Sequence, residues 1–151
     1  SSTQGTAIMY HNFYEYEYFK GNIPHRSQGV IISMSNGDVM AYALDGLRDR
    51  GVMFAKPGDK VYEGMIVGEH CEQNDIAVNV CRAKKATNMR SATADKGIKL
   101  SPPRDLTLEM ALEYIEDDEL IEITPKTFRL RKKLLREHDR KRQRTTPQVL
   151  K

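Results

Sequence analysis

Short runs of apolar and β-branched residues dominate the first part of the chain, and turn residues separate them. Such runs are typical of strands. Asn36-Gly37 lies between the first two runs, and Asn-Gly favours a hairpin because both positions accept positive φ. Pro57-Gly58 predicts another turn, and residues 44–51 predict a short helical turn. The expected strands lie within 29–35, 38–44, 61–70 and 75–80.

The period changes after Pro102-Pro103. Thr107 is suited to cap a helix in which Leu108, Ala111, Leu112 and Ile115 follow the i, i+3, i+4, i+7 spacing. This spacing predicts one amphipathic helix over 108–115. Residues 120–131 then predict a second hairpin that turns at Pro125-Lys126. From Leu134 the chain reads as helical or frayed, and beyond Thr145 as disordered.

These patterns together predict an α+β fold. Its core is expected to be predominantly antiparallel β and barrel-like, with one amphipathic helix and a long basic loop. The opening residues 6–19 predict a further strand with an aromatic extension. Its rings would form either a platform on which bases stack or, as we favour, a strand that packs between domains. The rings are those of Tyr10, Phe13, Tyr14, Tyr16, Tyr18 and Phe19.

Charge is distributed unevenly along the 151 residues. Residues 1–125 contain 13 basic and 19 acidic side chains, whereas residues 126–151 contain 11 basic and 2 acidic ones. A basic end of this kind indicates a polyanionic partner. Residues 81–97 form a second basic segment, in which only Asp95 opposes five cations.

The segment 81–97 is the main candidate for a functional site. Its Lys and Arg side chains can neutralise phosphates, and its short polar side chains suit phosphate and sugar oxygens. A solvated surface loop is the alternative, but surface loops usually mix both signs of charge. The sequence therefore predicts an RNA-binding loop whose candidate residues are Arg82, Lys84, Lys85, Thr87, Asn88, Arg90, Ser91 and Lys96.

Several other kinds of site are not indicated. The sequence has no phosphate-binding G-x-x-x-x-G-K-[ST] loop and no G-x-S-x-G motif. Cys71 and Cys81 fit free thiols in a reducing cytoplasm, and no catalytic or metal-binding residue is predicted. The acidic run 116–119 lacks the spacing of a calcium loop. No apolar run is long enough for a membrane span. The chain opens without an initiator Met, directly on a strand-like run, so we expect a piece of a longer protein, which we also expect to be cytoplasmic and monomeric.

Three stretches, at 61–70, 74–95 and 101–133, resemble the C-terminal region of the BipA or TypA family of translational GTPases, and the match covers about residues 27–140. The pattern K-K-x-T-N-x-R-S at Lys84–Ser91 is specific, and so is E-x-I-E-D-D-E-L at Glu113–Leu120. The opening is similar to the end of the preceding domain, which the family shares with elongation factor G. The segment after Ser91 departs from the family by carrying Lys96 rather than a more acidic continuation.

The resemblance implies a ribosome-associated GTPase whose GTP- and magnesium-binding domain lies upstream. It implies that the basic segment contacts large-subunit RNA and the acceptor arm of an A-site transfer RNA. It also implies roles in stress adaptation, growth at low temperature and ribosome assembly. Three parts are expected: the end of the preceding domain at 1–22, the family-specific domain at 23–136, and a basic, disordered tail at 137–151.

Two other functions stay open at this point. The acidic face 116–122 could instead dock a basic protein, with the basic loop incidental. A cryptic hydrolase using Cys71 or Cys81 would require a reactive thiol.

Overall fold

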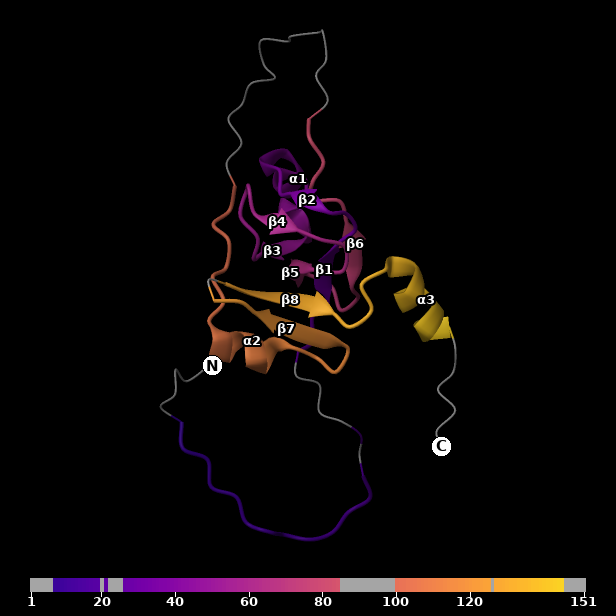
Figure 1. Ribbon diagram of the computed structural model, residues 1–151. Coiled ribbons are helices and arrows are strands. Elements are labelled where there is room, and N and C mark those ends of the chain that lie inside the picture. The colour runs from indigo at the N-terminus through magenta and orange to yellow at the C-terminus, as the bar shows by residue number, and fades with distance from the viewer. Residues whose placement is uncertain (1–6, 20, 22–25, 85–99, 126, 146–151) are drawn as a thin grey trace.

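A mixed four-stranded sheet forms the centre of the computed structural model, which describes residues 7–19, 21, 26–84, 100–125 and 127–145 (Figure 1). The strand order is β3-β5-β1-β6. Strand β5 pairs antiparallel with β1 and with β3, whereas β6 pairs parallel with β1. The strands span Val30–Ser33 (β1), Gly51–Met53 (β3), Ile66–His70 (β5) and Ile76–Val78 (β6).

Side chains from both faces of this sheet are buried. Within β1, Ile31 belongs to one hydrophobic cluster, and its neighbours Val30 and Ile32 belong to another. Because successive strand residues point to opposite faces, β1 lies between two apolar layers. Leu44 and Leu47 contribute to the first layer, and Ala111 and Leu130 to the second.

The hairpin predicted at Asn36-Gly37 is wrong. Strand β2 (Gly37–Asp38) pairs antiparallel with β4 (Lys60–Val61), not with β1. The Asn36 side chain accepts a hydrogen bond from the Glu63 amide at 2.8 Å, which ties this corner to a distant turn. Part of the second predicted strand is the helix α1 (Ala41–Asp45). Its apolar run was too short for periodicity to distinguish helix from strand.

Two other short-range predictions fare better in this region. The Asp59 amide donates to the Lys56 carbonyl at 3.1 Å across Pro57-Gly58, so the predicted turn is present. The helical turn predicted over 44–51 is partly correct, because the end of α1 is followed by a 3₁₀ turn at Arg48–Arg50.

The second half follows its predicted pattern more closely. Helix α2 spans Leu108–Tyr114, and the Thr107 hydroxyl accepts a hydrogen bond from the Met110 amide, as expected of an N-cap. Strands β7 (Glu119–Ile123) and β8 (Phe128–Lys132) form the predicted hairpin, with Ile121 opposite Leu130. The hairpin stays a separate sheet, but the Lys132 amide donates to the Gly64 carbonyl at 2.9 Å, which ties it to the turn that precedes β5.

The α+β class is confirmed, but the barrel-like core is not. The described part of the chain forms the four-stranded sheet and two separate two-stranded sheets, and these do not close into a barrel. Apart from the parallel pair of β1 and β6, the strands of the described residues pair antiparallel, in agreement with the predicted predominantly antiparallel core. The sheet instead buries its faces beneath α1 on one side and α2 with the hairpin on the other.

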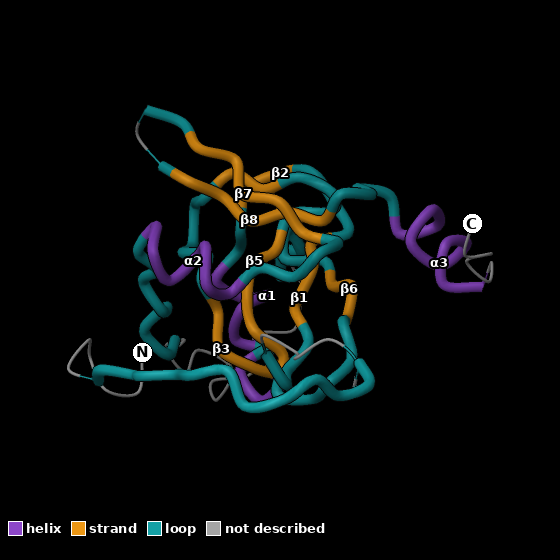
Figure 2. The backbone as a smooth tube through the Cα atoms, turned by 90° about the horizontal axis from the view of Figure 1, so that it is seen from below, coloured by secondary structure: helices purple, strands orange, loops and turns teal. Residues whose placement is uncertain are grey.

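The two ends of the described chain also differ from expectation. Residues 7–19 contain neither strand nor helix, so the strand predicted there is wrong. Helix α3 spans Glu137–Thr145, which agrees with the helical or frayed segment predicted from Leu134 but contradicts, as far as Thr145, the disordered tail expected from residue 137. Figure 2 shows α3 projecting outward beyond the end of β8, while its first turns share a small pocket with residues of β1 and β6. No helix in the described ranges is long and apolar enough to cross a membrane.

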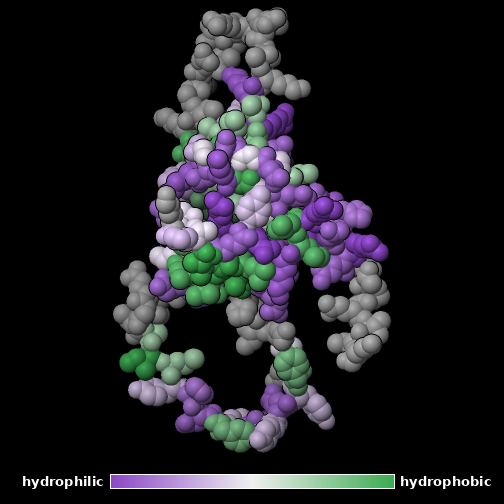
Figure 3. Space-filling model, viewed as in Figure 1, coloured by the Kyte–Doolittle hydropathy of each residue, from purple (hydrophilic) through white to green (hydrophobic). Residues whose placement is uncertain are grey.

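One predicted core face is partly exposed. Ala111 of α2 is fully buried, whereas Leu112 is 59% exposed. Exposed apolar side chains on α2 and β7 contribute to a hydrophobic surface on the lower side of the folded body in Figure 3, above the opening segment. Its members are Leu108, Met110, Leu112, Leu120 and Ile123.

Candidate nucleic-acid interface

The basic segment leaves the domain through a firmly anchored stem after β6. Val80 is fully buried, and its carbonyl accepts a hydrogen bond from the Met40 amide at 2.9 Å. The Asn79 side chain accepts from the Cys81 amide and from the Ser35 hydroxyl, both at 3.0 Å. The chain is therefore fixed up to Cys81, and the basic residues begin directly after this point.

The returning stem is anchored to the same sheet. Leu100 packs against the first hydrophobic cluster, and the Arg104 amide donates to the Met53 carbonyl at 2.8 Å. The Arg104 guanidinium also forms an ion pair with Glu69 of β5 at 3.2 Å. Both stems thus pack against the main sheet. The position of the segment is therefore set by these stem contacts and not by its basic side chains.

The predicted RNA-binding residues divide into two groups. Arg82 and Lys84 are exposed, and no ion pair to another described residue neutralises them. Cationic side chains in this state are available to phosphate groups. The other candidates lie outside the described residues; they are Lys85, Thr87, Asn88, Arg90, Ser91 and Lys96.

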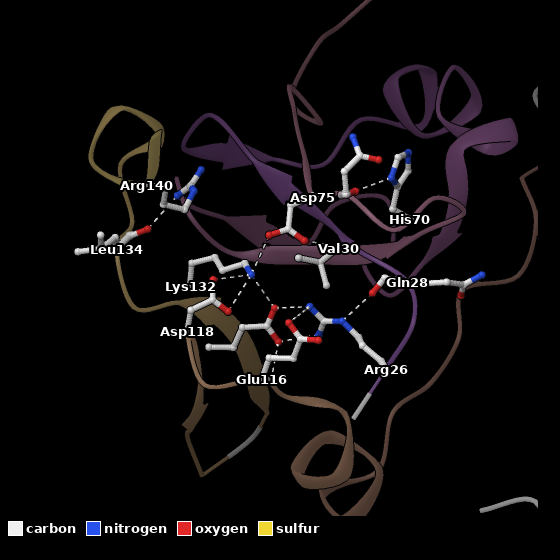
Figure 4. Close-up of polar contacts among 12 residues, drawn as sticks. Arg26, Gln28, Val30, His70, Asp75, Glu116, Asp118, Lys132, Leu134 and Arg140 are labelled. Carbon is white, nitrogen blue, oxygen red and sulfur yellow. Dashed lines mark hydrogen bonds and ion pairs between the residues drawn. The ribbon is translucent and has the colours of Figure 1, made fainter. Parts of the chain in front are cut away.

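Sequence reasoning missed a buried network of ion pairs beneath the hairpin (Figure 4). Arg26 donates two hydrogen bonds to the Glu119 carboxylate, at 2.7 and 2.6 Å. The Lys132 ammonium lies 2.8 Å from Glu119, 2.9 Å from Asp75 and 2.9 Å from Asp118. Because the Asp75 carboxylate also accepts from the Val30 amide, the network joins the hairpin to the main sheet.

Burial and pairing act in opposite directions on this network. Burial alone would raise the pKa of Glu119, but hydrogen bonds from Arg26 and Lys132 hold it below its ordinary value. Burial would likewise lower the pKa of Lys132, and its hydrogen bonds to Glu119 and Asp75 raise it instead. The groups are therefore charged near neutral pH and stabilise one another.

The same network bears on the acidic cluster. Carboxylate oxygens of Glu116, Asp118 and Glu119 lie within 4.8 Å of one another, close enough to surround a metal ion. However, the Lys132 ammonium occupies the space beside Asp118 and Glu119, and Arg26 lies 3.6 Å from Glu116. These cations neutralise the cluster and leave little net charge to attract a metal.

The acidic face is also largely engaged within the domain. Glu122 forms an ion pair with Arg131 at 2.7 Å and accepts a hydrogen bond from the Tyr62 hydroxyl at 2.6 Å. A basic protein docking here would have to compete with these internal partners. The structure thus gives the acidic face a structural role.

The aromatic opening is accessible but not organised as a platform. Its rings are 74–99% exposed. Within it, the rings of Phe13 and Tyr16 are tilted by 58° with centroids 5.1 Å apart. Residues 7–19 contain no strand, so the structure does not decide between a base-stacking platform and a strand that packs between domains.

The hydrolase alternative gains no support from the described residues. Cys71 and Cys81 are free thiols. His70 is buried, and its Nδ1 lies 2.7 Å from the Asn74 carbonyl oxygen. This contact engages the ring nitrogen of His70 within the β5–β6 connection. His70 therefore has a structural role there.

The comparisons with known proteins all lead to the same family. The sequence profile of the TypA/BipA C-terminal domain matches residues 28–137. A large ribosomal subunit assembly factor BipA from Bacillus subtilis is 46% identical over 143 residues, 94% of this chain and 23% of that protein. The BipA protein of Synechocystis is 50% identical over 86% of this chain and 22% of its own length. The BipA protein of Escherichia coli K12 is 46% identical over 96% of this chain and 24% of its own length. The chain spans about a quarter of these curated relatives.

Proposed function

This chain belongs to the TypA/BipA family through its C-terminal domain, and from that premise we propose that it is the RNA-contacting, ribosome-binding domain of a translational GTPase. The printed names of its relatives describe assembly factors of the large ribosomal subunit. We extend that association to this chain.

One observation carries the proposal. A strongly basic segment is attached at both ends to a rigid sheet, through Val80 on one side and Leu100 on the other. Its first charged side chains, Arg82 and Lys84, are exposed and have no acidic partner among the described residues. A sheet that holds uncompensated cations at its surface suits the recognition of a polyanion.

The proposed partners are large-subunit ribosomal RNA and the acceptor arm of an A-site transfer RNA. The basic side chains of the segment would contact phosphates, and its polar side chains would contact phosphate and sugar oxygens. The proposed contact residues are Arg82, Lys84, Lys85, Thr87, Asn88, Arg90, Ser91 and Lys96.

The rest of the proposal concerns the longer protein. GTP and magnesium would bind a domain outside this chain, and this chain would contribute no catalytic residue. Roles in ribosome assembly, stress adaptation and growth at low temperature would then follow from where the parent protein acts. The alternative, protein docking through 116–122, is less well supported because the carboxylates of that face already have intramolecular partners.

Binding to isolated large ribosomal subunits tests the proposal. We expect the triple variant Lys84→Ala, Lys85→Ala, Arg90→Ala to bind more weakly than the unaltered chain. If each side chain neutralises one phosphate, the slope of log affinity against log salt should decrease by roughly two to three units. Co-sedimentation across a salt series measures both quantities.

The matched control removes the same charge from other surfaces. Arg48, Arg50 and Lys133 are exposed and lie outside the basic segment. Their triple alanine variant should bind nearly as well as the unaltered chain, with only a small change of slope. Equal losses in the two triple variants would contradict the proposal, because net charge rather than the segment would then govern binding.

A further inference from the structure

The return stem of the basic segment forms one wall of a pocket of about 430 Å³. Arg104, Asp105 and Leu106 supply this wall, and the β3–β4 connection and the start of β8 supply two others. The volume lies within the range of pockets that hold small molecules. The residues of this wall thus follow closely in sequence after the segment proposed to contact RNA.

The floor of the pocket is apolar and partly aromatic. Ala55, Ile66 and Leu130 are buried beneath it, and the rings of Phe54 and Phe128 are half-buried at its sides. The Phe54 ring is held by an edge contact with Tyr114, with centroids 5.6 Å apart and planes at 87°. A flat, uncharged ligand could therefore bury its faces here without displacing a polar group of the floor.

The rim has a positive surplus. Lys56 is paired with Asp105 at 2.8 Å and Arg104 with Glu69 at 3.2 Å, so these two cations are compensated. Lys60 and Arg129 also line the pocket, and neither forms an ion pair with another described residue. Asp59 lies on the same rim, where its carboxylate accepts a hydrogen bond from the Lys56 amide at 2.7 Å, so the positive surplus is smaller than two charges. A net positive rim beside an apolar floor fits a ligand that joins a flat ring to an anion.

We propose that this pocket receives an unpaired nucleotide of the RNA. The base would lie on the apolar floor beside Phe54 and Phe128, and Lys60 and Arg129 would contact the flanking phosphates. Single-stranded RNA is bound in this way elsewhere, by stacking of exposed bases on aromatic side chains within a cationic groove. This inference rests on the proposed function, because the RNA would run from the basic segment along its return stem.

The test compares a 12-nucleotide single strand with the corresponding duplex, using the complete 151-residue chain and fluorescence anisotropy. The variant Lys60→Gln, Arg129→Gln should weaken single-strand binding severalfold and reduce its salt slope by about 1.4, since each contact on a single strand contributes about 0.7. Duplex binding should stay unchanged. Arg48→Gln, Arg50→Gln is the control of equal charge, and it should leave both affinities unchanged.

A second variant tests the aromatic floor. Phe128→Leu keeps an apolar side chain at the site but removes the ring, and we expect about tenfold weaker single-strand binding. A 2-aminopurine base in the strand should change its emission on binding to the unaltered chain and much less with Phe128→Leu. Thermal unfolding of each variant checks that the fold is retained. The emission change is compared at saturating protein concentrations, so that a weaker affinity does not by itself lower the signal.

The outcomes separate the two proposals. If the loop variant loses RNA binding while the pocket variants match their control, the pocket is not a nucleotide site and the proposed function stands. If the loop variant binds normally, the proposed function fails. Equal losses for duplex and single strand, or displacement of the RNA by an acidic peptide at similar concentration, would also overturn the nucleotide assignment.

Discussion

Glu119 is a side chain whose charge is stabilised entirely from within the domain. It is 2% exposed, and its carboxylate accepts hydrogen bonds from Arg26 and lies 2.8 Å from Lys132. Removing one partner from such a group leaves the others buried and uncompensated. The cost is typically larger than the net contribution of the intact network.

Glu119→Gln should therefore destabilise the domain at pH 7 by about 3 kcal/mol. The pKa of Glu119 is below its ordinary value of 4.5 in the folded state, so its contribution is present above that value. It is lost as the pH falls through the lower, folded-state pKa. The variant should consequently show a smaller loss of stability on acidification than the unaltered chain.

Urea unfolding at several pH values measures this difference. Glu72→Gln serves as the control, because Glu72 is exposed. It should leave both the stability at pH 7 and its acid dependence nearly unchanged. Parallel pH profiles for Glu119→Gln and the unaltered chain would contradict the assigned role of the network.

At the scale of elements, local signals decided which predictions succeeded. The Thr107 cap and the β7–β8 hairpin depend on residues close in sequence, and both are present. The Asn36-Gly37 turn also has the right local chemistry, but β2 found its partner in β4, more than twenty residues away. The parallel β1–β6 pair likewise joins distant segments. Non-local pairing of this kind leaves no short-range pattern to read.

The candidate site follows the same division. Unbalanced charge singled out Arg82 and Lys84, and both are exposed in the structure. Charge could not reveal the stems, since the burial of Val80 and Leu100 depends on the folded sheet. Arg26 was missed altogether because 93 residues separate it from Glu119.

The junction between β5 and α3 depends on a glycine. Gly64 has φ +88°, and a Cβ atom there would lie 2.6 Å from the Cα atom of Leu135, just before α3. Gly64→Ala should thus cost both backbone strain and displacement of this segment, together more than about 2 kcal/mol. Chemical denaturation measures the loss.

Gly58 offers a matched comparison for that variant. It has the same φ of +88°, but a Cβ atom there would meet nothing within 4 Å. Gly58→Ala should therefore show the cost of strain alone, about 1 kcal/mol. Equal losses at the two positions would mean that the close approach of Leu135 contributes nothing.

For the molecule as a whole, the contacts that stabilise the fold lie apart from the basic segment and its excess positive charge. The hydrophobic clusters and the buried network hold the sheets together, while the basic segment is attached at its stems. Replacing residues 84–99 by a Gly-Ser linker of equal length should leave the unfolding midpoint nearly unchanged, because the buried anchors Val80 and Leu100 are retained. Equal length also keeps the entropy of closing the loop nearly constant.

Thermal denaturation of the replaced chain checks this separation, and co-sedimentation with large ribosomal subunits shows whether binding is lost. A midpoint lowered by many degrees would mean that the segment contributes to the core. The proposed RNA binding would then be coupled to stability, which would contradict the separation of the segment from the core.

The buried network also bears on the order in which the chain can be completed during synthesis. Asp75, Asp118 and Glu119 are all made before Lys132, the cation that neutralises them. A nascent chain that ends before β8 would hold these carboxylates without their ammonium partner. Arg26 likewise has no Glu119 to pair with until 93 more residues have been added to the chain. The domain should therefore acquire its final packing in a single late step, when the second strand of the hairpin emerges.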